Sequence, residues 1–243
     1  MSGLPLAGKT ALVTGGGRGL GAALCEALAV SGARVIVADV KAELAEGHAR
    51  TLSGQGFKAR PATLDVGDAS QVAGVIDEIV TDDGRLDILI NNAGVDYTCP
   101  VDELEVEQWD HVIATNLRGP FLLSRLAARH MKHSGGGHIV NIASTAAKRA
   151  WPNAAAYHAS KWGLLGFSHA LHAELRPHGI RVSAVIAGGM RTPFLLDRFP
   201  DIDRNCLQEP SSVAAAVLAV LLMPAASVVP EISVLPMGET SWP

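Results

Sequence analysis

Short runs of β-branched and aliphatic residues alternate with longer amphipathic segments along most of this chain, and this alternation limits its fold more than any other feature. Near-continuous apolar runs are typical of strands buried on both faces of a sheet, and the helical segments between them allow the strands to run parallel with right-handed crossovers. The alternation therefore predicts an α/β fold: a doubly wound parallel sheet with helices on both faces. The clearest strand-like runs are TALVTG (10–15), RVIVADV (34–40), LDILINNAG (86–94), GHIVNIAS (137–144) and IRVSAVIAGG (180–189).

No break in this pattern divides the chain into domains. Its 243 residues fit one large α/β unit without a Pro/Ser/Gly-rich linker or a repeat, so we expect a single domain over residues 1–243. The alternation loosens over residues 193–210, which predict an irregular substrate loop that could hold a short helix. Ser211 or Ser212 would then cap the helix VAAAVLAVLLM, and PEISVLP (230–236) would form the last strand.

Charge and hydropathy argue against nucleic-acid and membrane partners. The formal net charge is −4 and like charges do not form long blocks, so no basic surface is indicated. The longest apolar run covers only residues 213–223, too few to span a bilayer, and the N-terminal sequence lacks the apolar region of a signal peptide. Cys25, Cys99 and Cys206 are scattered and odd in number, which argues against a disulfide framework. We therefore expect a soluble, cytoplasmic protein.

A glycine-rich turn, TGGGRGLG (14–21), joins the first strand to the first helix. Glycines permit positive φ angles and close backbone approach, and the helix start offers unpaired N–H groups to a pyrophosphate. The spacing G-x-x-x-G-x-G differs slightly from G-x-G-x-x-G, and a purely structural turn is the alternative, but the position between the first strand and a helix favours dinucleotide binding. The residues assigned to this site are Gly15, Arg18, Gly19, Leu20 and Gly21.

An acidic residue at the end of the second strand indicates which dinucleotide is bound. Asp39 lies about 20 residues beyond the glycines, where a carboxylate can accept hydrogen bonds from both ribose hydroxyls and would repel a 2′-phosphate. Arg18 or Lys41 could instead pair with that phosphate, so NADP is the alternative to the favoured NAD. The structural alternative for Asp39 is a helix N-cap or turn residue.

Tyr157 and Lys161 stand four residues apart in YHASK, ahead of a segment with helical spacing. Residues at i and i+4 lie on one face of a helix, so the phenol and the ammonium can reach one site. A cation within about 4–6 Å lowers the pKa of a neighbouring acid by roughly 1 to 3 pH units, which would make Tyr157 usable for proton transfer near neutral pH. For this pair alone, a half-buried tyrosine and a solvated lysine are the alternative.

Taken together, TGGGRGLG, NNAG (91–94) and YHASK resemble the short-chain dehydrogenase/reductase superfamily, in the family's order over roughly residues 8–192. The resemblance implies a Rossmann fold, a nicotinamide dinucleotide cofactor and oxidoreductase activity on CH–OH groups. It also implies a homodimer or homotetramer packed through helices, since closed symmetric assemblies are common among soluble enzymes.

The resemblance further implies catalytic and cofactor residues. Tyr157 would exchange a proton with the substrate oxygen, and Ser144 would hydrogen-bond that oxygen. Lys161 would lower the tyrosine pKa and hold the nicotinamide ribose, and Asn116 would support a water-linked proton route to the lysine. Taken alone, Ser144 would be an ordinary strand-end hydroxyl and Asn116 a helix kink or cap. The other implied cofactor contacts are Asp65, Val66, Asn92, Ala93, Gly94 and Thr192.

Two departures from the family pattern lie in the last third of the chain. AGGMRT (187–192) has alanine where the family usually has proline, although its glycines still permit the turn. The C-terminal stretch VVPEISVLPMGETSWP (228–243) replaces the T-G-x-x-x-x-V-D-G-G pattern, so the usual dimer edge is not indicated. Trp242 in this tail could cover an active site, with a surface tail as the alternative. Trp151, in the loop ahead of the tyrosine, is our candidate substrate contact, with simple packing as its alternative.

Nine histidines raise the question of a metal site. His130 with His133, and His169 with His172, have helical i, i+3 spacing, but two ligands without a third do not form a site, so none is predicted. His158 adjoins the tyrosine in sequence, yet successive helix residues point in different directions, so we assign it no catalytic role.

The leading hypothesis is an NAD-dependent oxidoreductase that interconverts a small secondary alcohol and a ketone, with Tyr157 as acid/base. The nearer alternative is an NADPH-dependent 3-oxoacyl-[acyl-carrier-protein] reductase, which would need a cationic groove for its carrier. The alternative of another class is a non-catalytic dinucleotide-sensing regulator. Dinucleotide binding alone does not require the four catalytic residues, so their presence argues against this alternative.

Overall fold

The computed structural model describes residues 3–239 and contains a seven-stranded parallel sheet, in the order β3-β2-β1-β4-β5-β6-β7. The predicted doubly wound fold is confirmed. The chain moves outward from β1 to β3, returns to β4 beside β1, and then moves outward in the other direction. Loops diverge where this order reverses, and such switch points form ligand clefts at the carboxyl ends of the strands. The strands are β1 (Thr10–Thr14), β2 (Arg34–Asp39), β3 (Ala59–Thr63), β4 (Ile88–Asn91), β5 (Gly137–Ile142), β6 (Ile180–Ala187) and β7 (Glu231–Val234).

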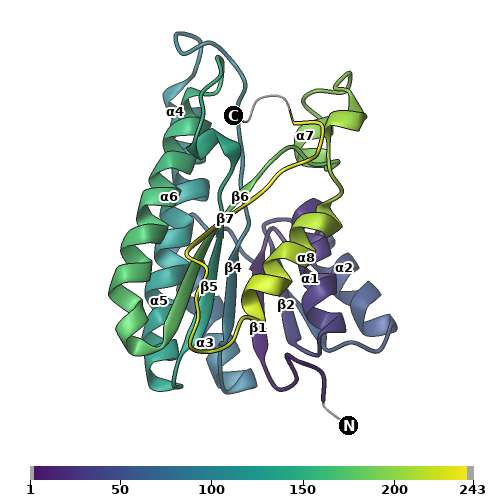
Figure 1. Cartoon of the computed structure of the whole chain (residues 1–243), viewed down its shortest axis with the longest axis vertical. Coiled ribbons are helices and arrows are strands. Elements are labelled where there is room, and N and C mark those ends of the chain that lie inside the picture. The colour runs from purple at the N-terminus through teal and green to yellow at the C-terminus, as the bar shows by residue number, and fades with distance from the viewer. Residues whose placement is uncertain (1–2, 240–243) are drawn as a thin grey trace.

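Helices cover both faces of the sheet (Figure 1). One face carries α1 (Gly19–Val30), α2 (Ala42–Gly54) and α8 (Pro210–Leu221). The other carries α3 (Ala69–Asp83), α4 (Val106–Ile113), α5 (Gly119–His133) and α6 (Ala155–Leu175). A π-helical turn, Ala114–Arg118, joins α4 to α5. The short helix α7 (Pro193–Leu196) lies above the sheet's carboxyl edge.

The strands at the centre of the sheet are buried on both faces. Every residue of β1 and β4 is buried, which explains their near-continuous apolar sequences. Two hydrophobic clusters lie on opposite sides of the sheet: one packs α1 and α8, the other α3 and α5. These clusters fix the strand ends that carry the candidate site.

The region after β6 differs in one detail from the prediction. The expected serine cap of α8 is wrong, because the helix begins at Pro210 with Glu209 as N-cap, and Ser211 and Ser212 lie in the first turn. Proline suits this first helical position because it needs no hydrogen-bond partner for an N–H and its φ is already helical. The last strand forms at β7 as predicted, and Trp242 lies outside the described residues.

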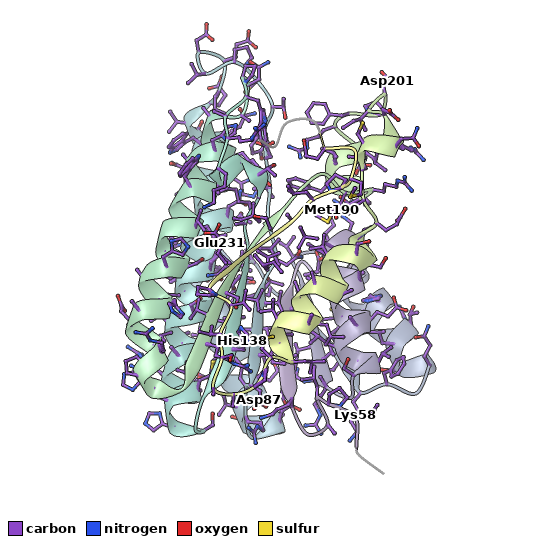
Figure 2. All side chains as sticks on the ribbon, in the orientation of Figure 1. Lys58, Asp87, His138, Met190, Asp201 and Glu231 are labelled. Atoms are coloured by element: carbon purple, nitrogen blue, oxygen red, sulfur yellow. The ribbon has the colours of Figure 1, made fainter. Side chains whose placement is uncertain are left out.

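The loop over residues 193–210 contains α7 and a 3₁₀ turn, Arg204–Cys206. A backbone bridge between Met190 and Gln208 closes its base. Figure 2 shows Met190 and Asp201 at the carboxyl edge of the sheet, whereas Asp87 and His138 lie near the opposite edge. The loop is therefore placed over the switch-point cleft.

Candidate active site

The glycine-rich turn folds back on itself at the end of β1. Gly15 and Gly19 have positive φ angles of 61° and 57°. A Cβ on Gly21 would lie 1.9 Å from the Gly15 carbonyl oxygen, so only glycine fits this crossing. Helix α1 begins at Gly19, within this glycine-rich segment, and its N-terminus receives no side-chain cap, which leaves backbone N–H groups available to a ligand. This cradle fits the pyrophosphate of a dinucleotide.

The NNAG segment holds the end of β4 against this turn. The side-chain amide of Asn92 donates to the carbonyls of Thr14 (2.8 Å) and Gly15 (3.2 Å). In return, the Thr14 hydroxyl oxygen accepts from the backbone N–H groups of Asn92 and Ala93, both at 3.1 Å. The segment thus sets the spacing between the two strands that border the cleft.

Asp39 ends β2 and is 8% exposed. Its two carboxylate oxygens accept from the backbone N–H groups of Gly17 (3.2 Å) and Lys41 (3.1 Å). Helix α2 has Lys41 as its N-cap, so Asp39 is not that cap. The hydrogen bond that it accepts from the N–H two residues on does give it the turn role that the structural alternative also named. The carboxylate is therefore oriented by the backbone beside the glycine cradle.

The two cations that could compete with Asp39 for a phosphate lie at the surface. Lys41 is exposed, and Arg18 forms an exposed ion pair with Asp197 at 3.7 Å. An ion pair of this kind contributes little stability, but it places the Arg18 guanidinium toward the loop over residues 193–210.

Three of the four predicted catalytic side chains come together where the carboxyl end of β5 meets the first turns of α6. Tyr157 and Lys161 lie on α6, and Ser144 follows β5. The Lys161 ammonium is 5.6 Å from the centre of the Tyr157 ring and donates to the Ile142 carbonyl oxygen at 2.9 Å. All three side chains line one cavity.

Asn116 lies behind this group rather than on the cavity wall. Its side chain is fully buried in the π-helical turn, donates to the Val95 carbonyl (2.8 Å) and the Ser160 hydroxyl (3.1 Å), and accepts from the Val95 N–H (2.8 Å). A Cβ on Gly94 would lie 3.4 Å from Asn116 Oδ1 and 3.8 Å from Lys161 Nζ. Asn116 therefore joins the loop after β4 to α6 close to the lysine.

Burial sets the pKa values of the tyrosine and the lysine. Desolvation raises the pKa of Tyr157 to about 12, and the nearby Ser144 side chain opposes this only in part. Desolvation also lowers the pKa of Lys161 to about 8. The expected lowering of the tyrosine pKa by Lys161 is therefore wrong in this structure, because the loss of hydration outweighs the lowering by the Ser144 hydrogen bond and the Arg198 charge.

A cavity of about 760 Å³ runs from the glycine cradle to the loop over residues 193–210. This volume lies in the range of small-molecule and cofactor sites. The predicted residues that line it are Gly15, Arg18, Gly19, Leu20, Gly21, Asp39, Asp65, Val66, Asn92, Ala93, Gly94, Ser144, Trp151, Tyr157, Lys161 and Thr192. Of the predicted site residues, Asn116 does not line this cavity.

Sequence reasoning missed an ion pair that lines the cavity. Asp96, from the loop after β4, pairs with Arg198 in the loop after α7. The Arg198 guanidinium carbon lies 4.1 Å from the centre of the Phe194 ring, and that ring lies 6.0 Å from the Tyr157 ring. Asp96, two places after NNAG, could have been identified from the sequence as a candidate cavity residue. Its partner Arg198 could not, because it lies in the irregular loop, where no sequence pattern locates side chains.

His158 has a structural role that its sequence position did not suggest. Its Nε2 accepts from the Trp151 backbone N–H at 3.2 Å, so its Nδ1 carries the proton and donates to the Ala146 carbonyl at 2.9 Å. The Trp151 and His158 rings also pack edge to face, with centroids 4.4 Å apart. This histidine therefore fixes the loop that carries Trp151.

The remaining histidines do not gather around a common point. No group of three or more His, Cys, Asp or Glu side chains suited to a metal ion occurs within residues 3–239. His130 and His133 lie in the last turn of α5. Among the same residues, no helix is long and apolar enough to cross a membrane.

A dinucleotide cradle at the switch point and a tyrosine, lysine and serine facing the same cavity define a nucleotide-dependent oxidoreductase of the Rossmann type. The family profile described as short chain dehydrogenase matches residues 9–203. The chain belongs to this family, and it is an oxidoreductase that acts on CH–OH groups. Enzymes of the family use a nicotinamide dinucleotide and act on small molecules.

Three similar proteins illustrate the range of the family. D-threitol dehydrogenase of Mycolicibacterium smegmatis is 43% identical over 180 residues, covering 74% of this chain and 69% of the relative. A metagenomic short-chain oxidoreductase solved with NADP has a TM-score of 0.86 and 33% identity, covering 96% of this chain and 99% of the other. A 3-ketoacyl-(acyl-carrier-protein) reductase from Brucella melitensis, solved with NADH, has a TM-score of 0.88 and 30% identity, covering 96% and 99%.

Proposed function

We propose that this enzyme interconverts a small secondary alcohol and the corresponding ketone, with NAD as cofactor and Tyr157 as acid/base. The observation that carries the proposal is one continuous cavity, lined at one end by Asp39 and the glycine cradle and at the other by Ser144 and Tyr157. A cofactor held at the first end would extend toward a substrate oxygen held at the second. The nicotinamide, when bound, supplies the acceptor or donor of hydride.

The proton chemistry belongs to the chain's own residues. The raised pKa of Tyr157 keeps it a phenol at neutral pH, so it can donate a proton to a ketone oxygen as that oxygen gains charge. In the opposite direction the same oxygen atom, deprotonated to the phenolate, would take the proton from an alcohol. The Ser144 hydroxyl faces the same cavity and would hydrogen-bond the substrate oxygen, which stabilises developing charge.

Lys161 has two features that suit a supporting role. It is 4% exposed and close enough to the phenol for its charge state to affect proton transfer. Its hydrogen bond to the Ile142 carbonyl fixes the ammonium on the cavity wall, where it could also bind a ribose hydroxyl. Asn116 would act through Lys161, since it joins the Val95 backbone to Ser160 on the same helix.

The preference for NAD rests on the charge and position of Asp39. Its carboxylate is fixed at the cavity wall by two backbone donors, and each oxygen retains a lone pair for a ribose hydroxyl. A 2′-phosphate at the same place would meet a negative charge at short range. Arg18 is the residue that favours the alternative, because its guanidinium also lines the cavity and its present partner is an exposed carboxylate.

The test is fluorescence titration of the purified protein with NADH and NADPH, followed by turnover with a panel of secondary alcohols and ketones. We expect tighter binding of NADH, and we expect Asp39→Ser to reduce the NADH-to-NADPH affinity ratio by roughly 10-fold or more, because it removes charge repulsion and a charged hydrogen-bond acceptor. Tighter NADPH binding by the parent would support the 3-oxoacyl-[acyl-carrier-protein] reductase alternative. Binding without turnover on any substrate would support the non-catalytic regulator.

A further inference from the structure

Asp96 carries a buried carboxylate oxygen without a hydrogen-bond partner. The side chain is 7% exposed, and its Oδ2 is paired with Arg198. Oδ1 is buried and has no hydrogen-bond partner within the part of the chain that the structure describes. Burial raises the pKa of this carboxyl, and the Arg198 charge and the Tyr97 N–H oppose that rise only in part. The Tyr97 N–H makes no hydrogen bond of acceptable geometry to Oδ1. Buried carboxylate oxygens in folded proteins nearly always accept a hydrogen bond, so Oδ1 requires a donor that the chain does not supply.

The orientation of this carboxylate is fixed by its partner. The Arg198 Nε donates to the Phe194 carbonyl at 2.9 Å, and the guanidinium stacks on the Phe194 ring. An arginine held by both a hydrogen bond and an aromatic face keeps its remaining donors in a fixed direction. Oδ2 is therefore kept on the arginine, and Oδ1 remains the buried oxygen without a partner.

The residue that carries the unpaired oxygen lines the same cavity as the reacting groups. Asp96, Arg198, Tyr157 and Ser144 all line it. The Phe194 ring contacts the Arg198 guanidinium on one side and lies 6.0 Å from the Tyr157 ring, so a single side chain separates the ion pair from the tyrosine. The charge of Asp96 also acts on the titration of Tyr157 and Lys161, which agrees with this proximity.

We propose that Asp96 Oδ1 accepts a hydrogen bond from a second hydroxyl of the substrate, on the carbon next to the one that reacts at Tyr157. The substrate class is then a vicinal diol or larger polyol, interconverted with the hydroxyketone. This inference rests on the proposed function and narrows its substrate. A substrate without the second hydroxyl would leave a buried charged acceptor unpaired, and such a loss discriminates by roughly 10- to 100-fold.

The experiment compares three ligands of similar shape: the stereoisomers of butane-2,3-diol, the enantiomers of butan-2-ol, and 3-methoxybutan-2-ol. The second oxygen can donate a proton in the diol, is missing in butan-2-ol, and can only accept in the methoxy compound. We expect the parent to oxidise at least one diol isomer with kcat/KM roughly 10-fold or more above both comparison alcohols.

Asp96→Asn tests the direction of the hydrogen bond. Its amide oxygen can keep the contact with Arg198, so its NH₂ group would replace the free acceptor with a donor. We expect the diol-to-methoxy ratio of kcat/KM to fall by roughly 10-fold in this variant. The NH₂ group of the asparagine can donate a hydrogen bond to the ether oxygen, whereas the carboxylate of the parent repels it. The methyl group is present in both measurements, so its bulk cancels from the comparison. Asp201→Asn, an exposed change in the loop that carries Arg198, should keep the parental ratio.

A parallel binding measurement separates this inference from the proposed function. Thermal shift with butane-2,3-diol or butan-2-ol, in the presence of NADH or NADPH, reports substrate binding without turnover. Stabilisation by the diol that Asp96→Asn removes would support the inference even if no alcohol were oxidised, an outcome that would refute the proposed function alone. Turnover or binding with equal preference for the three ligands, or ratios unchanged in Asp96→Asn, would overturn the inference and leave the proposed function standing. Absence of both turnover and diol binding would overturn both.

Discussion

The ammonium of Lys161 lies 5.6 Å from the centre of the Tyr157 ring at one cavity, where Lys161 is buried and Tyr157 is partly buried. Burial disfavours the charged form of either group, so each pKa shifts in the direction that keeps the group neutral. The pKa of Tyr157 rises to about 12, and the pKa of Lys161 falls to about 8. A buried lysine with a lowered pKa costs stability while it is protonated, and this cost provides a measurement of its environment.

Replacement of Lys161 should therefore change how stability depends on pH. The folded pKa of Lys161 lies below its unfolded value, so between about pH 8 and about pH 10.4 the unfolded chain binds more protons, and this residue makes the parent more stable as pH rises. Lys161→Met lacks that contribution. We expect the stability of the parent relative to the variant to rise by up to about 3 kcal/mol across this window, measured by urea unfolding.

The comparison of the two proteins isolates Lys161 from other titrating groups. Burial also raises the pKa values of Cys25 and Tyr157, and both groups work in the opposite direction at alkaline pH, but they are present in parent and variant alike. Parallel stability curves from pH 7 to 10.5 would show that Lys161 is as well solvated in the folded chain as in the unfolded one.

Tyr157→Phe tests the proton-transfer role directly. The phenol oxygen is the group that we propose exchanges a proton with the substrate, and general acid/base catalysis typically contributes roughly 10² to 10⁴-fold. We expect kcat to fall by that factor, while NADH affinity, set by the glycine cradle and Asp39, stays close to the parental value. Steady-state kinetics and a fluorescence titration on the same preparation check both parts. Equal turnover by parent and variant would remove Tyr157 from the mechanism.

Much of the fold could be predicted because local patterns and long-range packing agree in this chain. The buried runs at β1, β4 and β5 are apolar enough to identify as strands, and the glycine turn identifies the crossing between β1 and α1. Residues that share a strand end or a helix face, such as Tyr157 and Lys161, could be brought together by spacing alone.

Features that depend on contacts between distant segments could not be predicted. The pair of Asp96 and Arg198 joins residues 102 positions apart, and one of them lies in an irregular loop. The sign of the Tyr157 pKa shift depended on the depth of burial, which helical spacing does not give. The N-cap of α8 was misplaced for a local reason instead, since a proline at the first helical position outweighed the serines that follow it.

His158 offers a test of how the loop that carries Trp151 is positioned. His158→Ala would remove the acceptor of the Trp151 N–H, the donor to the Ala146 carbonyl and the ring contact with the indole. We expect KM for the substrate to rise roughly 3- to 30-fold, with a smaller change in kcat, because the lost contacts position a cavity wall and do not touch the reacting atoms. His133→Ala, an exposed change at the end of α5, is the control. A fall in kcat at unchanged KM would instead place His158 in the chemical step.

Replacement by alanine should have opposite effects at two glycines, Gly17 in the glycine-rich turn and Gly47 in α2. A Cβ on Gly17 would lie 2.6 Å from the Leu44 Cβ and 3.0 Å from Asp39 Oδ2, so Gly17→Ala must displace the turn or the start of α2. The Gly17 N–H would then lose its alignment with Asp39, and we expect NADH affinity to fall by roughly 10-fold or more.

Gly47, inside α2, has open space where a Cβ would be. Gly47→Ala should leave NADH affinity unchanged and raise the free energy of unfolding by about 0.5–1 kcal/mol, because alanine loses less backbone entropy than glycine when a helix forms. Urea unfolding and NADH titration of both variants check the pair. Unchanged NADH affinity in Gly17→Ala would show that the turn has room to move, and the tight contact between Gly17 and α2 would then have no part in cofactor binding.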